Sequence, residues 1–308
     1  MDSSRRKALI SAAGLAALAA MKPSATAAQS ALSALSERTI PATGERLPVI
    51  GVGTWQTFDA GGDKVARGAL KEVLTAFAKG GGRVIDSSPM YGTSETVTGD
   101  LVAETGLAGK LFIATKVWAE GKNEGVRQMD TSFKRLRVSR MDLMQIHNLV
   151  DADTHTRTLE EWKAKQRVRY IGITHYTRSA YGELERYLRM GKYDFLQINY
   201  SLAERDSEDR LLPLAAEKKA AVIINRPFAE GAMFRKVRGK PVPDWAAEFG
   251  AKTWAQFFLK WIVSHPAVTC VIPGTGKPEH MLDNLAAGTG ALPDAAMRKR
   301  MAQHFDTL

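Results

Sequence analysis

Cysteine is almost absent from this sequence of 308 residues, which contains only one. With Cys270 alone, neither an intramolecular disulfide nor a cysteine-based zinc cluster can form, and we expect no metal site. Cys270 lies inside the apolar run Val268–Ile272, a setting typical of a small core residue rather than a nucleophile. Long apolar runs are also missing: after the N-terminal region none approaches the ~20 residues of a membrane-spanning helix, so we expect no stable membrane anchor.

Charge of one sign is in excess but is not concentrated in one place. The formal net charge is +10 and the pI is near 9.6, which permits nucleic acid or a membrane surface as a partner. The lysines and arginines are scattered among acidic residues, mostly on predicted outer helices, and this pattern indicates solvated faces. We therefore expect no nucleic-acid partner, with an anion-attracting cavity mouth as the alternative.

The N-terminal region has the three parts of an export signal. Arg5-Arg6-Lys7 is followed by an alanine-rich apolar run over 8–20 and then by small residues at 24–28. A basic region, a short apolar region and a cleavage motif predict a signal peptide over residues 1–27, followed by a linker over 28–37. The paired arginines resemble a twin-arginine (Tat) signal, which would make the Tat machinery a partner during targeting and the periplasm the destination. A tail without a targeting role is the alternative.

Buried strands and amphipathic helices alternate along the rest of the chain. A short hairpin is predicted over 38–48, and strands over 49–53, 83–86, 111–116, 141–147, 168–174, 195–199, 221–225 and 269–272. The main helices are predicted over 63–79, 94–105, 124–136, 159–165, 179–189, 208–219 and 252–264. Such β–α pairs over about 250 residues indicate an α/β fold, a (β/α)8 TIM barrel with an N-terminal β-hairpin, as a single domain over 38–308.

An open, doubly wound sheet is the competing architecture. Its fingerprint, Gly-x-Gly-x-x-Gly, would join the first strand to a helix. In this sequence Gly51-Val52-Gly53 runs into Thr54-Trp55 and not into a helix start. The closed barrel is therefore favoured.

Three of the predicted strands end in a polar residue. Asp86, Lys116 and His147 follow one another at intervals of about 30 residues, the length of one β–α–β repeat. Because parallel strands of one barrel end at the same face, we expect these side chains to meet there, beside Tyr91 in the turn after Asp86. A carboxylate, an ammonium, an imidazole and a phenol at one strand-end face predict proton-transfer chemistry.

The chemistry of these four groups suggests a role for each. Tyr91 has an ordinary pKa of about 10, and a neighbouring ammonium, Lys116, is expected to lower that pKa by stabilising the tyrosinate. Asp86 would hold Lys116 in place, and His147 would orient or polarise a carbonyl oxygen, which leaves Tyr91 as the proton donor. The structural alternative is that Asp86 and Lys116 form a buried ion pair that only closes the barrel mouth.

Six short motifs carry a family resemblance by their identity and order. They are Gly51–Trp55, Asp86–Gly92, Thr115–Val117, Gln145–Asn148, Gly172–His175 and Ile272–Thr275. With them the sequence resembles the aldo/keto reductase superfamily over residues 38–300. The resemblance implies an NAD(P)-dependent oxidoreductase whose catalytic tetrad is Asp86, Tyr91, Lys116 and His147. Hydride then passes between a nicotinamide cofactor and the carbonyl carbon of a small-molecule substrate while Tyr91 protonates the oxygen, or the reverse for an alcohol.

The resemblance also implies which residues contact the cofactor, normally NADPH, and the substrate. The cofactor contacts are Gly53, Thr54, Trp55, Thr174, His175, Gln197, Asn225, Arg226, Pro227, Phe228, Gly231, Pro273, Gly274, Thr275, Lys277, His280, Asp283 and Asn284. The substrate-pocket residues are Trp55, Tyr91, Trp118 and His147.

Several of these positions depart from the family pattern. His175 stands where an asparagine is usual, and Asn225 stands where a ring usually stacks on the nicotinamide. Gly274 and His280 stand where cations often seat the 2′-phosphate of NADPH, although Lys277 supplies a cation nearby. We therefore expect NADPH, with NADH as the alternative, and Arg226 as a partner of the pyrophosphate because guanidinium matches phosphate oxygens.

Two other functions are compatible with the same barrel. Lys116 in a barrel mouth is compatible with a Schiff-base aldolase that uses the lysine as nucleophile. A regulatory barrel that binds the cofactor with little turnover is the other alternative. The complete tetrad favours the reductase.

Overall fold

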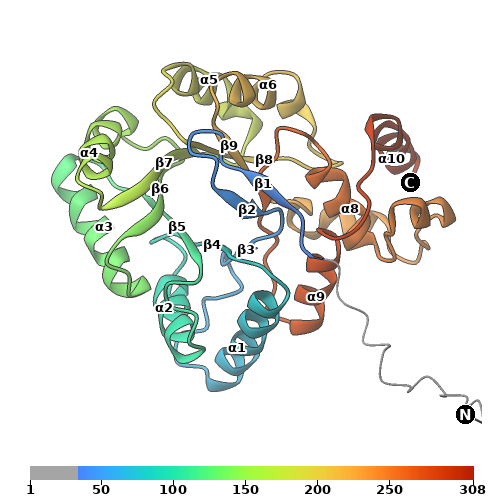
Figure 1. Cartoon of the computed structure of the whole chain (residues 1–308), viewed down its shortest axis with the longest axis horizontal. Helices are drawn as coiled ribbons and strands as arrows, with labels where there is room; N and C mark the ends of the chain where they lie inside the picture. Colours follow the sequence, from blue (N-terminus) through green and yellow to red (C-terminus); the bar gives the residue numbers. More distant parts are fainter. Residues whose placement is uncertain (1–33) are drawn as a thin grey trace, which may run out of the picture. The chain divides into compact units, whose positions relative to one another are not determined.

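The computed structural model describes residues 34–308. The predicted signal peptide and the first residues of the predicted linker lie outside this part. Figure 1 shows a ring of strands surrounded by helices. Among residues 34–308, no helix has both the length and the apolar character that a membrane crossing needs.

Eight strands form one parallel sheet in the described part of the chain, and each strand pairs with its neighbours in sequence. They are β3 (Val52–Gly53), β4 (Val84–Asp86), β5 (Phe112–Val117), β6 (Met141–His147), β7 (Val168–Thr174), β8 (Phe195–Asn199), β9 (Ala221–Asn225) and β10 (Cys270–Val271). A parallel bridge between Ile50 and Val271 joins the first strand to the last. The prediction of a closed (β/α)8 barrel is confirmed.

The closure depends on two glycines near β3. A Cβ atom on Gly51 would lie 2.8 Å from the carbonyl oxygen of Val84, and one on Gly53 would lie 2.8 Å from that of Ile272. These approaches are too close for any side chain, so the first strand reaches both of its neighbours only because glycine lacks a Cβ. The regular part of β3 covers two residues, fewer than the five predicted over 49–53.

The hairpin closes one end of the barrel, opposite the carboxyl ends of the strands. Strands β1 (Glu37–Thr39) and β2 (Arg46–Pro48) pair in antiparallel fashion, as predicted. Leu47 of β2 and Ile40, which follows β1, join the buried cluster inside the barrel, which contains Val84, Phe112, Ala114, Leu143, Tyr170, Phe195, Ala221, Ile223, Cys270 and Ile272. These apolar side chains fill the barrel near the hairpin, so the polar residues of the sheet lie at the opposite end. Cys270 is a core residue, as expected, and burial raises the pKa of its thiol.

The helices cover the outside of the sheet. They are α1 (Lys64–Lys79), α2 (Ser94–Glu104), α3 (Lys122–Leu136), α4 (Ala152–Ala164), α5 (Tyr181–Arg189), α6 (Leu211–Glu217), α7 (Ala232–Lys236), α8 (Trp254–Val263), α9 (Pro278–Ala286) and α10 (Ala295–Thr307). Helix α4 begins seven residues before the predicted start at 159. Its first turns carry the polar residues His155, Thr156 and Thr158, which are buried, so the apolar pattern that predicts a helix starts late.

The first turns of two helices differ from what their residue types suggest. In α1 the apolar residue Val65 is 84% exposed, and the buried face starts at Leu70. Serine is a common N-cap residue, but Ser94 is the first helical residue of α2, after the N-cap Thr93. The Ser94 hydroxyl donates to the carbonyl oxygen of Thr54 at 3.3 Å instead.

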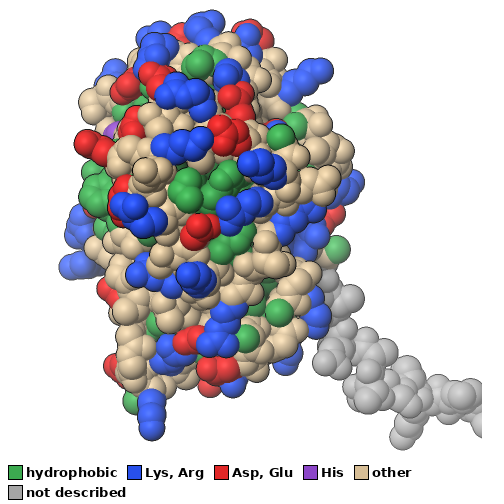
Figure 2. All heavy atoms as spheres, turned by 90° about the vertical axis from the view of Figure 1, so that its left-hand side faces the viewer, with side chains coloured by type: hydrophobic (Ala, Val, Ile, Leu, Met, Phe, Trp, Pro, Cys, Tyr) green, Lys and Arg blue, Asp and Glu red, His purple; other side chains and the backbone are tan. Residues whose placement is uncertain are grey.

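Basic residues on the outer helices are mixed with acidic ones. Figure 2 shows lysine and arginine side chains interspersed with aspartate and glutamate on the face turned to the viewer. On α3 and α4, Lys122 pairs with Glu161 at 3.1 Å, and Arg167 after α4 pairs with Asp130 at 2.7 Å. Such exposed pairs contribute little to stability, and the mixture agrees with solvated faces.

Candidate active site

A cavity of about 590 Å³ opens at the carboxyl ends of the strands, the end at which (β/α)8 barrels carry their active sites. Asp86 lies at its floor, and Tyr91 and His147 belong to its wall. The predicted cofactor residues that line it are Gly53, Thr54, Trp55, Thr174, His175, Gln197, Asn225, Arg226, Pro227, Phe228, Gly231 and Gly274.

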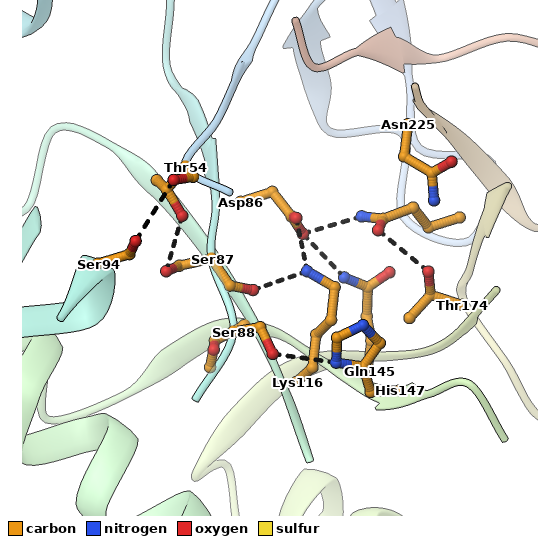
Figure 3. A network of polar contacts seen from close by, with 12 residues as sticks. Thr54, Asp86, Ser87, Ser88, Ser94, Lys116, Gln145, His147, Thr174 and Asn225 are labelled. Carbon is orange, nitrogen blue, oxygen red and sulfur yellow. Dashed lines mark hydrogen bonds and ion pairs between the residues drawn. The ribbon is translucent and has the colours of Figure 1, made fainter. Parts of the chain in front are cut away.

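A buried ion pair lies at the centre of the site (Figure 3). The ammonium of Lys116 donates to Asp86 Oδ2 at 2.6 Å and to the carbonyl oxygen of Ser87 at 2.7 Å. The Lys116 side chain is 0% exposed and that of Asp86 is 3% exposed. Burial by itself would lower the pKa of Lys116, but Asp86 and then Tyr91 more than offset it, so the pKa is raised. Lys116 is therefore a permanent cation at neutral pH.

The carboxylate of Asp86 is held by two amides as well as by the lysine. Gln197 Nε2 donates to Asp86 Oδ1 at 2.8 Å, and Gln145 Nε2 donates to the same oxygen at 3.1 Å. Thr174 Oγ1 donates to Gln197 Oε1 at 3.0 Å, so Gln197 is fixed from both sides. Asp86 accepts three hydrogen bonds and thereby anchors its neighbours.

Tyr91 lies above this pair. Its ring centroid is 5.1 Å from Lys116 Nζ. Burial raises the pKa of Tyr91, the charge of Lys116 partly offsets this rise, and Asp86 adds to it. The expectation that Lys116 lowers the pKa of Tyr91 is correct for that one interaction, but desolvation outweighs it. The phenol therefore keeps its proton at neutral pH.

His147 lies beside the phenol, with its ring 5.8 Å from that of Tyr91 in an edge-on arrangement. Burial, the charge of Lys116 and the nearby His175 lower the pKa of His147 to about 2. The imidazole is neutral at any physiological pH. Its Nδ1 lies 3.0 Å from the hydroxyl oxygen of Ser88.

The four polar residues predicted to meet are thus brought together, and the spacing argument missed their supports Ser88 and Gln145. Both stand two positions from a predicted member of the group, Ser88 after Asp86 and Gln145 before His147. Because alternate residues of an extended chain point to the same side, this spacing was the signal that could have found them.

One wall of the cavity has the donors and acceptors that a carboxamide needs. His175 Nδ1 accepts from the backbone N–H groups of Tyr176 at 2.9 Å and Thr177 at 3.2 Å, so the ring proton lies on Nε2. Asn225 Nδ2 donates to the carbonyl oxygen of His175 at 3.2 Å, and the buried Asn225 Oδ1 has no hydrogen-bond partner among residues 34–308. An N–H donor and a free carbonyl oxygen on one wall fit the nicotinamide carboxamide, which has one acceptor and one donor group.

Arg226 belongs to the same wall and already has partners. Its backbone has a left-handed φ of 48°. Its guanidinium donates to the carbonyl oxygen of Tyr176 at 3.1 Å and lies 3.7 Å from Glu204 and 3.5 Å from Glu230. The two carboxylates offset much of its charge, so a phosphate at Arg226 has to compete with them.

The outer part of the predicted cofactor site does not line this cavity. Pro273, Thr275, Lys277, His280, Asp283 and Asn284 lie on the segment that leads into α9 and on α9 itself. Asp283 accepts from Thr253 at 2.8 Å and from Gln256 at 2.7 Å, which ties α9 to the start of α8. No side chain among the described residues caps the N-terminus of α9, so this helix start is compatible with a phosphate seat.

Trp118, predicted as a pocket wall, is also outside the residues that line the cavity. Gln128 holds its backbone on both sides, accepting from the Trp118 N–H at 2.6 Å and donating to the carbonyl oxygen at 2.9 Å. This clamp ties the end of β5 to α3, while the indole remains 41% exposed. Trp55, which is 44% exposed, does line the cavity.

Comparison with known proteins agrees with this geometry. The family model described as the aldo/keto reductase family matches residues 49–302. The chain is 27% identical over 260 residues to methylglyoxal reductase YeaE of Escherichia coli, an alignment that covers 82% of this chain and 89% of the relative. It is 26% identical over 300 residues to an NADP-dependent D-sorbitol-6-phosphate dehydrogenase of Malus domestica, with 83% and 90% of the two chains covered.

Solved structures show the same fold. An aldo/keto reductase from Klebsiella pneumoniae, in complex with NADP and acetate, superposes with a TM-score of 0.73 at 24% identity, and the match covers 85% of this chain and 93% of that one. The family model spans the whole barrel from the first strand to α10. The chain belongs to the aldo/keto reductase family of NAD(P)-dependent oxidoreductases.

Proposed function

We propose that this protein reduces an aldehyde or ketone to an alcohol, with Tyr91 as the proton donor. The observation that carries the proposal is the buried Lys116–Asp86 pair beneath a protonated Tyr91 and a neutral His147 in one cavity. A bound NADPH, with NADH as the alternative, supplies the hydride for the carbonyl carbon. The chain supplies the proton, the orientation of the carbonyl and the exclusion of water.

The proton comes from the Tyr91 hydroxyl and goes to the carbonyl oxygen. The O–H bond of the phenol breaks as the new O–H bond of the alcohol forms, which leaves a tyrosinate. Lys116 is a permanent cation at the ring of Tyr91, and it stabilises that negative charge. Because Asp86 fixes the ammonium from the other side, the cation is in position before the reaction and needs no reorganisation during it. Solvent then returns the proton to Tyr91.

The cofactor is held in this proposal by hydrogen bonds from one wall. His175 and Asn225 take the carboxamide, and Gln197, which is fixed by Thr174, supports them. The N-terminus of α9, with Lys277, takes the phosphate at the other end. Asn225 cannot stack on a ring, so hydrogen bonding replaces stacking at this position.

The surroundings of Lys116 disfavour the aldolase alternative. A Schiff-base lysine attacks as a neutral amine and needs access to the substrate. Lys116 is fully buried, donates to Asp86 and to Ser87, and has a raised pKa. The amine is therefore neither free nor deprotonated.

The substrate enters past apolar side chains. Trp55, Met90, Tyr176 and Phe234 line the cavity and are each 38–44% exposed. Two methylglyoxal reductases of Escherichia coli are among the relatives, so methylglyoxal belongs in the test panel beside aromatic and aliphatic aldehydes and ketones.

The test is cofactor titration followed by a carbonyl panel. Purified protein lacking residues 1–27 should bind NADPH, with NADH as the comparison, and oxidise it on addition of a carbonyl from the panel. Tight binding of the cofactor with no turnover on any carbonyl would support the regulatory alternative. Absence of binding to both cofactors would refute the proposal.

The N-terminal region extends the proposal to location. We propose that residues 1–27 are a twin-arginine signal, that the folded barrel is exported to the periplasm, and that the cofactor is loaded before export. Replacement of Arg5 and Arg6 by lysine should keep the protein in the cytoplasm. Exported protein, once denatured, should release nicotinamide dinucleotide. An unchanged location of the lysine variant, or no released nucleotide, would refute the respective part.

A further inference from the structure

A buried hydroxyl lies directly behind the imidazole of His147. Ser88 Oγ is 3.0 Å from His147 Nδ1, and Figure 3 shows the two side chains joined by a dashed line. Ser88 is 0% exposed and His147 is 6% exposed. None of the steps proposed above uses Ser88.

The backbone around Ser88 explains why the hydroxyl lies there. Ser88 stands two residues after Asp86, so both side chains point to the same side of the extended chain. The following residue is Pro89, which restricts Ser88 to an extended conformation. The carbonyl oxygen of Ser88 accepts from the N–H of Tyr91 at 3.1 Å. One residue therefore anchors the turn that carries Tyr91 and contacts the ring of His147.

The hydrogen bonds of Ser88 assign its proton. The N–H of Met90 points at Ser88 Oγ from 3.4 Å, so the oxygen already faces one donor. Among the described residues, the acceptor found for the Ser88 hydrogen is His147 Nδ1. If His147 donated instead, the Ser88 hydrogen would be buried without an acceptor, which costs about 1–3 kcal/mol.

We infer that Ser88 is a positioning residue that holds His147 as the neutral tautomer with its proton on Nε2. This inference rests on the proposed function. His147 Nδ1 is turned to Ser88, so the opposite nitrogen of the ring presents an N–H group to the cavity. An N–H group attracts a carbonyl oxygen and orients it for the proton of Tyr91. An unprotonated Nε2 would present a lone pair, which repels that oxygen.

The imidazole by itself does not select between its tautomers. Because burial, Lys116 and His175 keep the ring neutral, one of the two nitrogens carries the proton at every working pH, and a neighbour must decide which. Ser88 selects the tautomer through its hydrogen bond to Nδ1, on the side of the ring away from the cavity. Loss of its hydroxyl leaves Nδ1 without a partner and the ring free to turn.

The test reads the tautomer directly. Protein labelled with ¹⁵N-histidine gives separate ring-nitrogen signals by NMR, and the His147→Gln variant identifies those of His147. We expect an unprotonated Nδ1 and a protonated Nε2 in the full-length protein and in Ser88→Thr, and a shift toward the other tautomer in Ser88→Ala. Ser87→Ala is the matched control, because Ser87 is equally buried but its hydroxyl accepts from Thr54 at 2.9 Å; the His147 signals should not move.

Kinetics provide the second readout. Ser88→Ala should lower kcat/KM for carbonyl reduction roughly tenfold, leave the affinity for NADPH within about twofold, and be rescued by Ser88→Thr. A proton on Nδ1 in the parent protein would overturn the inference, and so would unchanged His147 signals in Ser88→Ala. The spectrum of the parent protein alone decides which nitrogen carries the proton, even if a variant does not fold. Absence of reduction in a protein with the expected tautomer would overturn the proposed function and leave the tautomer assigned.

Discussion

The substitution Asp86→Asn tests whether the ion pair at the floor of the site is charged and desolvated. The new side chain keeps the shape of the old one but removes the counter-charge 2.6 Å from Lys116 Nζ. The ammonium is 0% exposed. Of its oxygen partners among the described residues, the carbonyl oxygen of Ser87 at 2.7 Å then remains. Loss of one member of a buried pair costs about 3–5 kcal/mol, and we expect this loss in the free energy of unfolding near neutral pH.

The loss should depend on pH with a definite sign. In the parent protein Asp86 raises the pKa of Lys116 above its ordinary value of 10.5, so the stabilisation is complete below that value and is lost as the pH rises through the folded-state pKa. In Asp86→Asn the burial that lowers the pKa of Lys116 has no opposing carboxylate. The folded variant must then bury an ammonium that the unfolded chain keeps in water, which lowers the free energy of unfolding. This penalty shrinks as the pH approaches 10.5, because the lysine of the unfolded chain then also loses its proton.

Urea denaturation at neutral pH and again above pH 10 measures both parts. A domain of ordinary stability, about 5–15 kcal/mol, tolerates the loss and still shows a complete transition. The matched control is Glu161→Gln, which breaks the pair of Glu161 with Lys122, whose side chains are 49% and 54% exposed; it should cost less than about 1 kcal/mol. If Asp86→Asn costs no more than Glu161→Gln, or if its cost does not fall with rising pH, the reasoning is refuted.

Three further predictions concern the proton donor, the pH profile and the barrel closure. Tyr91→Phe should lower carbonyl reduction by about 10²–10⁴-fold while the affinity for NADPH, measured by fluorescence, stays within about twofold; a large loss of affinity would mean that Tyr91 has another role. Burial, Lys116 and His175 lower the pKa of His147 to about 2, and the pKa of Tyr91 is raised. The kcat/KM for reduction should therefore be flat from about pH 5 to 8 and fall only in the alkaline range, as Tyr91 loses its proton. A step in kcat/KM near pH 6.5 would contradict this. Gly51→Ala places a Cβ 2.8 Å from the carbonyl oxygen of Val84 and should lower the free energy of unfolding, measured by heat or urea, by about 1–3 kcal/mol. The control is Gly68→Ala in α1, where a Cβ meets nothing within 4 Å; it should raise the free energy of unfolding by about 0.5–1 kcal/mol.

The sequence predicted the fold and the group of four because both depend on periodic signals. Strands β6, β7, β8 and β9 begin and end at the predicted residues, since each is a mostly apolar run between turn residues. The interval of about 30 residues between Asp86, Lys116 and His147 follows from the β–α–β repeat, and the structure brings all three to the same end of the barrel. Periodic placement requires no knowledge of side-chain contacts.

The supports of the site could not be predicted in the same way, because each depends on a contact across the barrel. Gln145 and Gln197 hold Asp86 from two other strands. The spacing along the chain can place each amide at the strand-end face, but it does not show that the amide donates to this carboxylate. The segment 226–250 forms short helical turns, among them α7, in a stretch for which no strand or helix was predicted. Arg226 was predicted to be a partner of the cofactor's pyrophosphate, and that stays a prediction; the nearby carboxylates of Glu204 and Glu230, which lie 22 residues before it and 4 after it, could not be foreseen from the sequence.

The balance of burial and charge at Tyr91 shows how the site favours reduction. Lys116 was expected to lower the pKa of Tyr91, and it does oppose the rise, but burial outweighs it. The ammonium shares its charge with Asp86 Oδ2 and with the Ser87 carbonyl oxygen, so less of its field acts on the neutral phenol. A phenol that keeps its proton is the form that carbonyl reduction consumes, whereas alcohol oxidation needs the tyrosinate. The charge of Lys116 becomes useful at the moment when the proton leaves Tyr91, because only then is there an anion for it to stabilise. Burial of the phenol and burial of the ion pair therefore act together: the first keeps the proton on Tyr91 until a carbonyl oxygen takes it, and the second makes that transfer possible.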